Sequence, residues 1–168
     1  MLTKEEFKQA CGEEIRVIRH IATKIDPAKL DWRPSQNQRS TIELLRYLSM
    51  CYVGPVKALL EDDWSVIGKY QESADKTGLD GFDKAMANQE REVSTLLESV
   101  APGDLDTRQC KLPWGVTQPL GEALFGAPLR FLIAYRMQLF LYAKQSGASE
   151  LNTHNAWLGM DQPQPAST

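Results

Sequence analysis

The residues that could do chemistry are few and scattered in this sequence. The 168-residue chain has two histidines, His20 and His154, and three cysteines, Cys11, Cys51 and Cys110, none of them in a C-x-x-C pair. An odd, scattered set of cysteines is typical of reduced thiols, so we expect a cytoplasmic protein. A nucleophilic cysteine needs a nearby base or cation. No histidine lies near Cys51 in the sequence, so we interpret Cys51 as a buried core residue.

Two tyrosines and two glutamines are the other candidate site residues. Phe131, Tyr135 and Gln138 follow at spacings of four and three, so they share one face of a helix. Tyr47 lies one turn before Cys51, and Gln89 interrupts an apolar stripe. The tyrosines either fill core volume with their hydroxyls hydrogen-bonded, which we favour, or hold a small polar or aromatic ligand. Gln89 is either a polar residue at the edge of its stripe or a group that lines an internal cavity.

The segment that must position these residues is a helix from Pro128 to Gly147, the longest apolar run of the chain. Its apolar residues spread over more than one face, which predicts burial on more than one side. Because a bundle covers only the inward side, we expect Leu132, Phe140 and their neighbours to form a homodimer interface. The alternative is that a loop or the C-terminal segment around Trp157 covers this face. We expect that the run is too short, and too interrupted by polar residues, to cross a membrane.

Three further helices are predicted by caps and apolar stripes. Thr3 and Ser40 each begin a capping box, which predicts helices from residue 3 to 25 and from residue 41 onward. Gly54-Pro55 predicts a kink or break near Tyr52. Asp80 is a candidate cap for the third helix, after a long surface loop over 61–80 with at most one helical turn at Trp64. Residues 104–117 read as a connector, and no segment shows convincing strand alternation.

These elements predict an all-α four-helix bundle with a long connection between helices 2 and 3. The length and the single set of stripes indicate one domain over residues 1–160. The polar, proline-containing residues 161–168 are expected to be a disordered tail. The net charge is −3 and no Lys/Arg cluster exceeds a pair. We therefore expect no nucleic-acid partner and no membrane partner.

Three short motifs give the chain a resemblance to the DinB-like superfamily of four-helix bundles. They are WRP at 32–34, TIELLRYL at 41–48 and FLIAYRMQL at 131–139, followed by QSG. The resemblance implies the same bundle and a site where three histidines bind a divalent metal. Those histidine positions are Tyr47, Phe131 and Tyr135 here, while Arg136 and Gln138 keep the residues of the family pattern.

The histidine replacements predict that the metal has been lost, since phenylalanine offers no ligand and a neutral tyrosine is a poor one. We therefore expect no cofactor. The favoured function is a non-enzymatic, dimeric binding or interaction protein. The alternative is a metal-independent enzyme of transferase or hydrolase type, with Tyr47 or Tyr135 as proton donor in the former metal pocket. A small-molecule ligand remains open under both interpretations.

Overall fold

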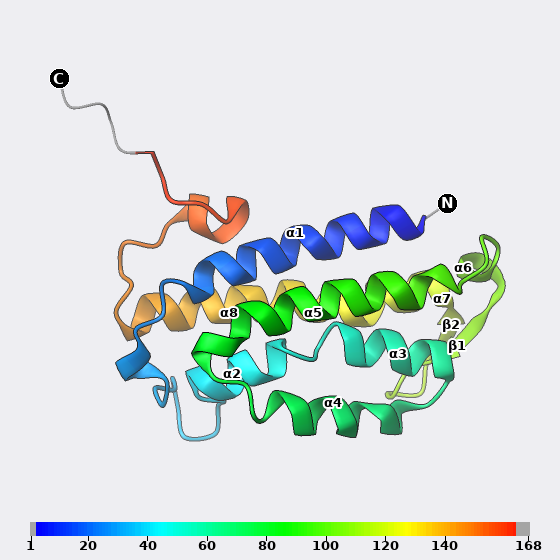
Figure 1. Ribbon diagram of the computed structural model, residues 1–168, viewed down its shortest axis with the longest axis horizontal. Coiled ribbons are helices and arrows are strands. Elements are labelled where there is room, and N and C mark those ends of the chain that lie inside the picture. The colour runs from blue at the N-terminus through cyan, green and yellow to red at the C-terminus, as the bar shows by residue number, and fades with distance from the viewer. Residues whose placement is uncertain (1–2, 164–168) are drawn as a thin grey trace.

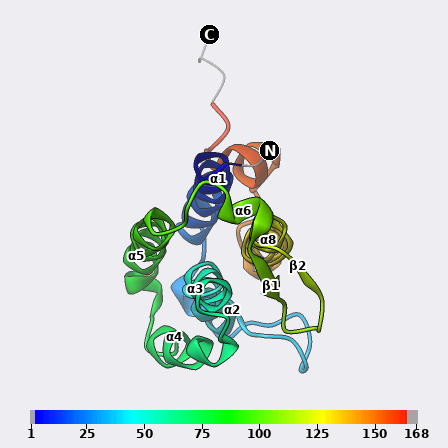
Figure 2. The same ribbon diagram turned by 90° about the vertical axis from the view of Figure 1, so that its right-hand side faces the viewer.

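The computed structural model describes residues 3–163, and four long helical segments form the framework of the bundle (Figure 1). In order around the bundle they are α1, α5, the pair α2 and α3, and α8, with α8 closing against α1 (Figure 2). This architecture confirms the expected all-α bundle. The helices are α1 (Lys4–Ala22), α2 (Thr41–Leu48), α3 (Val53–Glu61), α4 (Ile67–Ala74), α5 (Leu79–Glu98), α6 (Asp104–Thr107), α7 (Leu120–Leu124) and α8 (Arg130–Ser146).

Both predicted capping boxes are present. Thr3 accepts a hydrogen bond from the backbone of Glu6, whose carboxylate accepts one from the backbone of Thr3. Ser40 and Glu43 make the same reciprocal pair at the start of α2. Each box satisfies backbone donors that the first helical turn leaves without partners, so these starts are encoded locally.

The predicted break near Tyr52 separates α2 from α3. Tyr52 is the residue that precedes α3, and Pro55 is the third residue of the new helix. A proline in the first turn loses nothing, because the amide it lacks would have had no partner in the helix. The Gly54-Pro55 signal therefore marks a new helix start rather than a kink in one helix.

The expected loop over 61–80 is wrong, because much of it is helical. A 3-10 turn, η2 (Trp64–Val66), leads directly into α4. Helix α4 packs outside the framework on α2 and α3 (Figure 2). A side-chain carbon added at Gly54 would come within 3.6 Å of Ile67 and 3.8 Å of Tyr70, so this glycine allows α4 to lie close to α3. Asp80 is not a cap, since α5 begins at Leu79 after Gly78 without a side-chain cap.

Two short strands replace part of the expected connector over 104–117. Strand β1 (Gln109–Lys111) pairs antiparallel with β2 (Thr117–Pro119), with Cys110 opposite Gln118. Three residues per strand are too few to show a period-two pattern, so these strands were not predicted.

Helix α8 is the end of a longer helical segment that starts at Leu120. Helix α7 continues through a π-helical turn, η3 (Phe125–Leu129), into α8, and Pro128 lies in that turn. The π turn loosens the helix where Pro128 lacks its amide.

This continuous segment corrects one expectation about membranes. Leu120–Ser146 spans 27 residues with a mean hydropathy of 1.2, which is long and apolar enough to cross a membrane by length and composition. The segment is therefore not too short, as expected from the run after Pro128 alone. In the bundle it packs against α1, and 39% of its 18-residue apolar window is buried, so most of that window is not enclosed by the bundle.

The C-terminal residues fold back along α1 and α8 in a single turn, η4 (His154–Leu158). Trp157 is not the buried anchor that was expected, because 60% of its surface is exposed. Asp161, at the start of the expected disordered tail, accepts hydrogen bonds from Lys24 and Asn155. The rest of that tail from residue 164 lies outside the described residues.

Candidate functional site

We call the three positions that the resemblance assigns to histidines the aromatic cluster: Tyr47 on α2, and Phe131 and Tyr135 on α8, all packed against the core. The ring contact within this cluster joins Tyr47 and Tyr135. The ring centroids of Tyr47 and Tyr135 are 4.6 Å apart. The guanidinium of Arg39 lies 4.4 Å from the Tyr47 ring and 5.7 Å from the Tyr135 ring, in the range of a cation–π contact. All three aromatic residues are half-buried against the core. We had expected them to lie fully in the interior of the bundle.

Cys51 is fully buried one turn from Tyr47, and its thiol points to the carbonyl of Leu48 at 3.8 Å. Burial raises the pKa of the Cys51 thiol above its ordinary value, and burial also raises the pKa of Cys11 to about 12. The third thiol, Cys110, is buried as well, and all three cysteines are free. A thiol whose pKa is raised carries almost no thiolate at neutral pH, so these cysteines are poor nucleophiles.

Gln138 anchors the connector between α1 and α2 to α8. Its amide donates to the Tyr142 hydroxyl at 2.8 Å, and that hydroxyl donates to the carbonyl of Arg39 at 3.0 Å. The Trp32 ring meets the Tyr142 ring edge-on, with centroids 5.3 Å apart. Gln138 therefore has a structural use here, since it fixes the segment that carries Arg39.

Gln89 is 3% exposed, and its side chain makes hydrogen bonds to backbone groups at the break between α2 and α3. Its oxygen accepts from the backbone amides of Tyr52 and Val53 at 3.1 and 3.2 Å. Its amide donates to the carbonyl of Leu48 at 2.8 Å. These are the backbone groups that lose their helical partners at the break, so α5 supplies what the interrupted helix lacks.

Arg136, which keeps a residue of the family pattern, is a buried charge. It is 3% exposed, and its guanidinium pairs with Glu14 of α1 at 2.5 Å. It also donates to the carbonyl of Ala156 and lies 4.7 Å from the Trp157 ring. Arg136 therefore joins α1, α8 and η4, and it does not face the aromatic cluster.

The two histidines lie away from the aromatic cluster. His20, near the end of α1, is 3.0 Å from the Asn155 amide and 3.6 Å from Asp161. Burial lowers the pKa of His20 below its ordinary value, with Asp161 opposing that shift. His154 starts η4. Within residues 3–163, no group of three His, Cys, Asp or Glu side chains is arranged to hold a metal ion.

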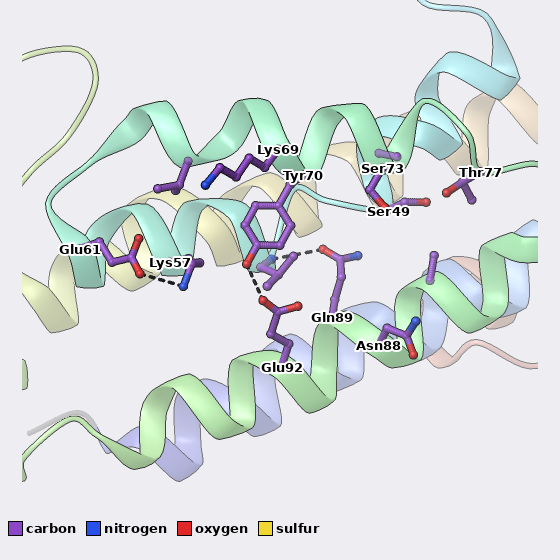
Figure 3. Close-up of a pocket in the computed structure, with 14 residues that line it drawn as sticks. Ser49, Lys57, Glu61, Lys69, Tyr70, Ser73, Thr77, Asn88, Gln89 and Glu92 are labelled. Atoms are coloured by element: carbon purple, nitrogen blue, oxygen red, sulfur yellow. Dashed lines mark hydrogen bonds and ion pairs between the residues drawn. The ribbon is translucent and has the colours of Figure 1, made fainter.

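A cleft of about 620 Å3 lies between α4 and α5, with α3 as its floor (Figure 3). We call it the α4–α5 cleft. One end carries Lys57, Glu61 and Lys69, and Tyr70 spans the middle by donating a hydrogen bond to Glu92. Sequence reasoning missed this site, because it placed a loop where α4 lies. The lining residues are Ser49, Val53, Lys57, Glu61, Val66, Lys69, Tyr70, Ser73, Ala74, Thr77, Ala85, Asn88, Gln89 and Glu92.

Gln89 lines this cleft, yet its polar atoms turn away from it toward the break between α2 and α3. No other expected site residue borders the cleft, since the aromatic cluster, Cys51 and Gln138 are absent from its lining. Tyr47 borders a second, shallower basin of about 510 Å3 beside Arg33, Arg39 and Arg46. The expected site residues are thus divided between a filled cluster and two surface hollows.

Comparisons with known proteins agree with the fold. Neither the protein-family models nor the curated protein sequences give a match to this chain. The crystal structure of a DinB-like protein (YjoA) from Bacillus subtilis matches with a TM-score of 0.68 over 89% of this chain and 96% of that chain. The two sequences are 19% identical over this match, so the likeness concerns the fold alone. The chain therefore has the DinB-like fold that its short motifs indicated.

Proposed function

We propose that this protein is a non-enzymatic binding or interaction protein that works as a homodimer on a DinB-like scaffold. The observation that carries the proposal is the uncovered apolar face of the segment Leu120–Ser146. A cytoplasmic location is part of the proposal, supported by the three free cysteines. The net charge of −3 argues against a nucleic-acid partner.

Loss of the family metal is the second part of the proposal. The aromatic cluster offers two phenol oxygens and a hydrocarbon ring in place of imidazoles, and burial raises the pKa of the Tyr47 phenol. A phenol that stays protonated is a poor ligand for zinc or nickel, so the residues present do not fit the metal. Elemental analysis of untagged protein should find far less than one transition metal per chain. A stoichiometric metal that disappears in Tyr135→Phe would contradict this part.

The alternative, an enzyme that uses Tyr47 or Tyr135 as a proton donor, receives less support. A general acid works best when its pKa lies near the operating pH, and the pKa of Tyr47 moves away from that range. Arg39 stacks on both rings and occupies the approach to them. The buried thiols add no nucleophile next to the cluster.

The proposed interface is the outer face of the long segment, which we define as Phe125, Ile133, Ala134, Met137 and Leu141. Phe125 is 37% exposed, Ile133 43% and Leu141 46%. Leu132, which we expected on this face, is fully buried and belongs to the core, while Phe140 is half-buried. Arg130 is exposed on the same segment, so the apolar residues of this face do not form one unbroken patch. Exposed apolar patches on a core helix often mark interfaces.

We propose one register for a second copy of this chain on the outer face. If two long segments cross antiparallel about a two-fold axis at Ile133, Phe125 meets Leu141 of the partner subunit, because the two positions are equally far from residue 133. The same register places Glu122 opposite Lys144 of the partner subunit. Both charges are exposed at opposite ends of the apolar face, so the charge pattern is self-complementary, as an isologous interface requires.

Mass measurement by size exclusion with light scattering, at micromolar concentration, tests the dimer. The native chain should show the dimer mass, and Ile133→Glu should shift it to the monomer, because two carboxylates would be buried at the axis. Met160→Glu is the matched control, since Met160 is 50% exposed but lies outside the face, and it should stay dimeric. A monomer mass for the native chain would overturn the proposal.

A charge-exchange series tests the register. Glu122→Lys and Lys144→Glu should each weaken the dimer several-fold, because like charges then face each other. The double variant should recover most of the lost affinity. If the double variant is no better than the single ones while Ile133→Glu still dissociates the dimer, the face is right and the register is wrong.

A further inference from the structure

The α4–α5 cleft holds two solvent-exposed, opposite charges that make no ion pair within residues 3–163. Lys69 on α4 makes no ion pair with any described residue, and Glu92 on α5 accepts one hydrogen bond, from Tyr70. The other two charged residues of the lining, Lys57 and Glu61, form an ion pair with each other at 2.8 Å. The lining therefore carries two positive and two negative side chains, and one of each sign remains available to a ligand.

The opposite end of the cleft offers neutral hydrogen-bond donors. Ser73, Thr77 and Asn88 lie there (Figure 3), and within the described chain neither hydroxyl donates to another protein group. The Asn88 oxygen accepts from Arg91, while its amide hydrogens have no acceptor among residues 3–163. Between the two ends the floor is apolar, formed by Val53, Ala74 and Ala85 among others.

We propose that the α4–α5 cleft binds a small zwitterion of the amino-acid or dipeptide class. Its carboxylate lies at Lys69 beside Lys57, its ammonium group lies at Glu92, and its polar end reaches Ser73, Thr77 and Asn88. A ligand with one charge only would leave either the lysine or the glutamate without a counter-charge. A zwitterion satisfies both, and its hydrocarbon part covers the apolar floor.

The volume of the cleft and the hydrogen bond that holds Glu92 in place agree with such a ligand. Its volume of about 620 Å3 falls in the range of pockets that hold small molecules, roughly 300–1,000 Å3. Tyr70 fixes one oxygen of Glu92 by a hydrogen bond across the cleft, which leaves the other oxygen for the ligand. Burial and the neighbouring Glu92 raise the pKa of Tyr70, so its hydroxyl remains a donor at neutral pH.

The test uses alanylglutamine as the probe, with its N-acetyl form and its C-terminal amide as analogues that each lack one charge. Binding is measured on the full chain by calorimetry and by the rise in Tm that a ligand of the native state produces. Alanylglutamine should bind saturably in the micromolar to millimolar range. Each blocked analogue should bind about ten-fold or more weakly, since it loses one charge-assisted contact.

Variants connect the binding to the cleft. Lys69→Gln and Glu92→Gln should each weaken alanylglutamine about ten-fold, and each should remove the difference between the zwitterion and the analogue that lacks the matching charge. Lys84→Gln and Glu98→Gln are the matched controls, because both residues are exposed on α5 outside the cleft, and they should bind as the native chain does. An unchanged Tm without ligand shows that each variant is folded.

Three results would overturn the proposal. They are no saturable binding of alanylglutamine up to about 10 mM, equal binding of a blocked analogue, and full binding by both cleft variants. If a blocked analogue binds as well as alanylglutamine, and only Lys69→Gln weakens binding, the cleft is a site for a simple anion instead. None of these results depends on the oligomeric state, so the dimer proposal is tested separately.

Discussion

The aromatic cluster and the α4–α5 cleft both lie between helices, yet one is filled and the other is open. In the cluster the rings of Tyr47 and Tyr135 touch and Arg39 covers them. In the cleft about 620 Å3 remains between α4 and α5, above an apolar floor. The cluster joins helices of the framework, where large side chains meet across the contact. The short helix α4 rests on α2 and α3 and faces α5 only across a gap (Figure 2). An added outer helix thus creates a site that the bundle itself does not contain.

Gln89 separates these two regions and shows how polar groups behave in each. Its amide group is fully used by the backbone of the break between α2 and α3. On its cleft side, Asn88 and Ser73 leave donors without protein acceptors among residues 3–163. Satisfied polar groups stabilise a fold, whereas unsatisfied groups at an open surface cost little and are available for binding.

The largest effect on stability that we predict comes from Gln89→Leu. The substitution leaves the amides of Tyr52 and Val53 and the carbonyl of Leu48 without partners in a dry site. At roughly 1–3 kcal/mol for an unsatisfied buried group, partly relieved by local rearrangement, we expect a loss of about 3 kcal/mol in the free energy of unfolding. Urea unfolding followed by circular dichroism measures it.

Asn88→Leu is the control for this comparison, because Asn88 is exposed next to Gln89 in the sequence and on the rim of the cleft. It should change the free energy of unfolding by less than about 0.5 kcal/mol, as exposed substitutions usually do. Equal losses in both variants would mean that the contacts of Gln89 are not what holds the break together.

Local signals in the sequence were sufficient to predict the framework helices. The capping boxes at Thr3 and Ser40 and the stripe from Phe82 to Val93 depend on residues within one or two turns. The break at Tyr52 was predictable for the same reason, since Pro55 acts on its own helix. The partners that repair the break come from α5, and that pairing across the bundle has no local signal.

Helix α4 could not be read from the sequence, because its stability depends on contacts outside itself. Only Ala74 is buried among its eight residues, and its position depends on the close approach of Ile67 and Tyr70 to Gly54. An eight-residue helix is marginal without tertiary packing. The cleft could not be predicted either, because residues of α4 form one of its walls.

The candidate site was predicted in part. The meeting of Tyr47 and Tyr135 followed from helical spacing together with the family resemblance, and the ring contact is present. The burial of Arg136 had no signal, because its partner Glu14 lies 122 residues away on α1. The exposed residues of α8 were misplaced for a related reason. The spread of apolar residues indicated an uncovered side, but Leu132 faces the core and Ile133 faces solvent.

The smallest effect that we predict concerns the filled region and depends on pH. Burial, with Cys51 and Tyr135 as further causes, raises the pKa of Tyr47 above its ordinary value. The native state therefore favours the protonated phenol. This contribution to stability is complete below the unfolded pKa of about 10 and is lost as the pH rises above it, because the unfolded chain can then release the proton.

Tyr47→Phe isolates this contribution, since phenylalanine keeps the ring and cannot ionise. At pH 7 the variant should be within about 1 kcal/mol of the native chain, as for the loss of one hydroxyl. At pH 10.5 the difference should move in favour of the variant by about 0.5 kcal/mol, a value reduced because solvent screens the half-buried ring. Phe131→Leu, in the same cluster, has no proton to lose, so its difference from the native chain should be the same at both pH values. An equal shift in the two variants would mean that the alkaline loss arises elsewhere, and no shift in Tyr47→Phe would mean that solvent reaches the Tyr47 hydroxyl and that the cluster is open like the cleft.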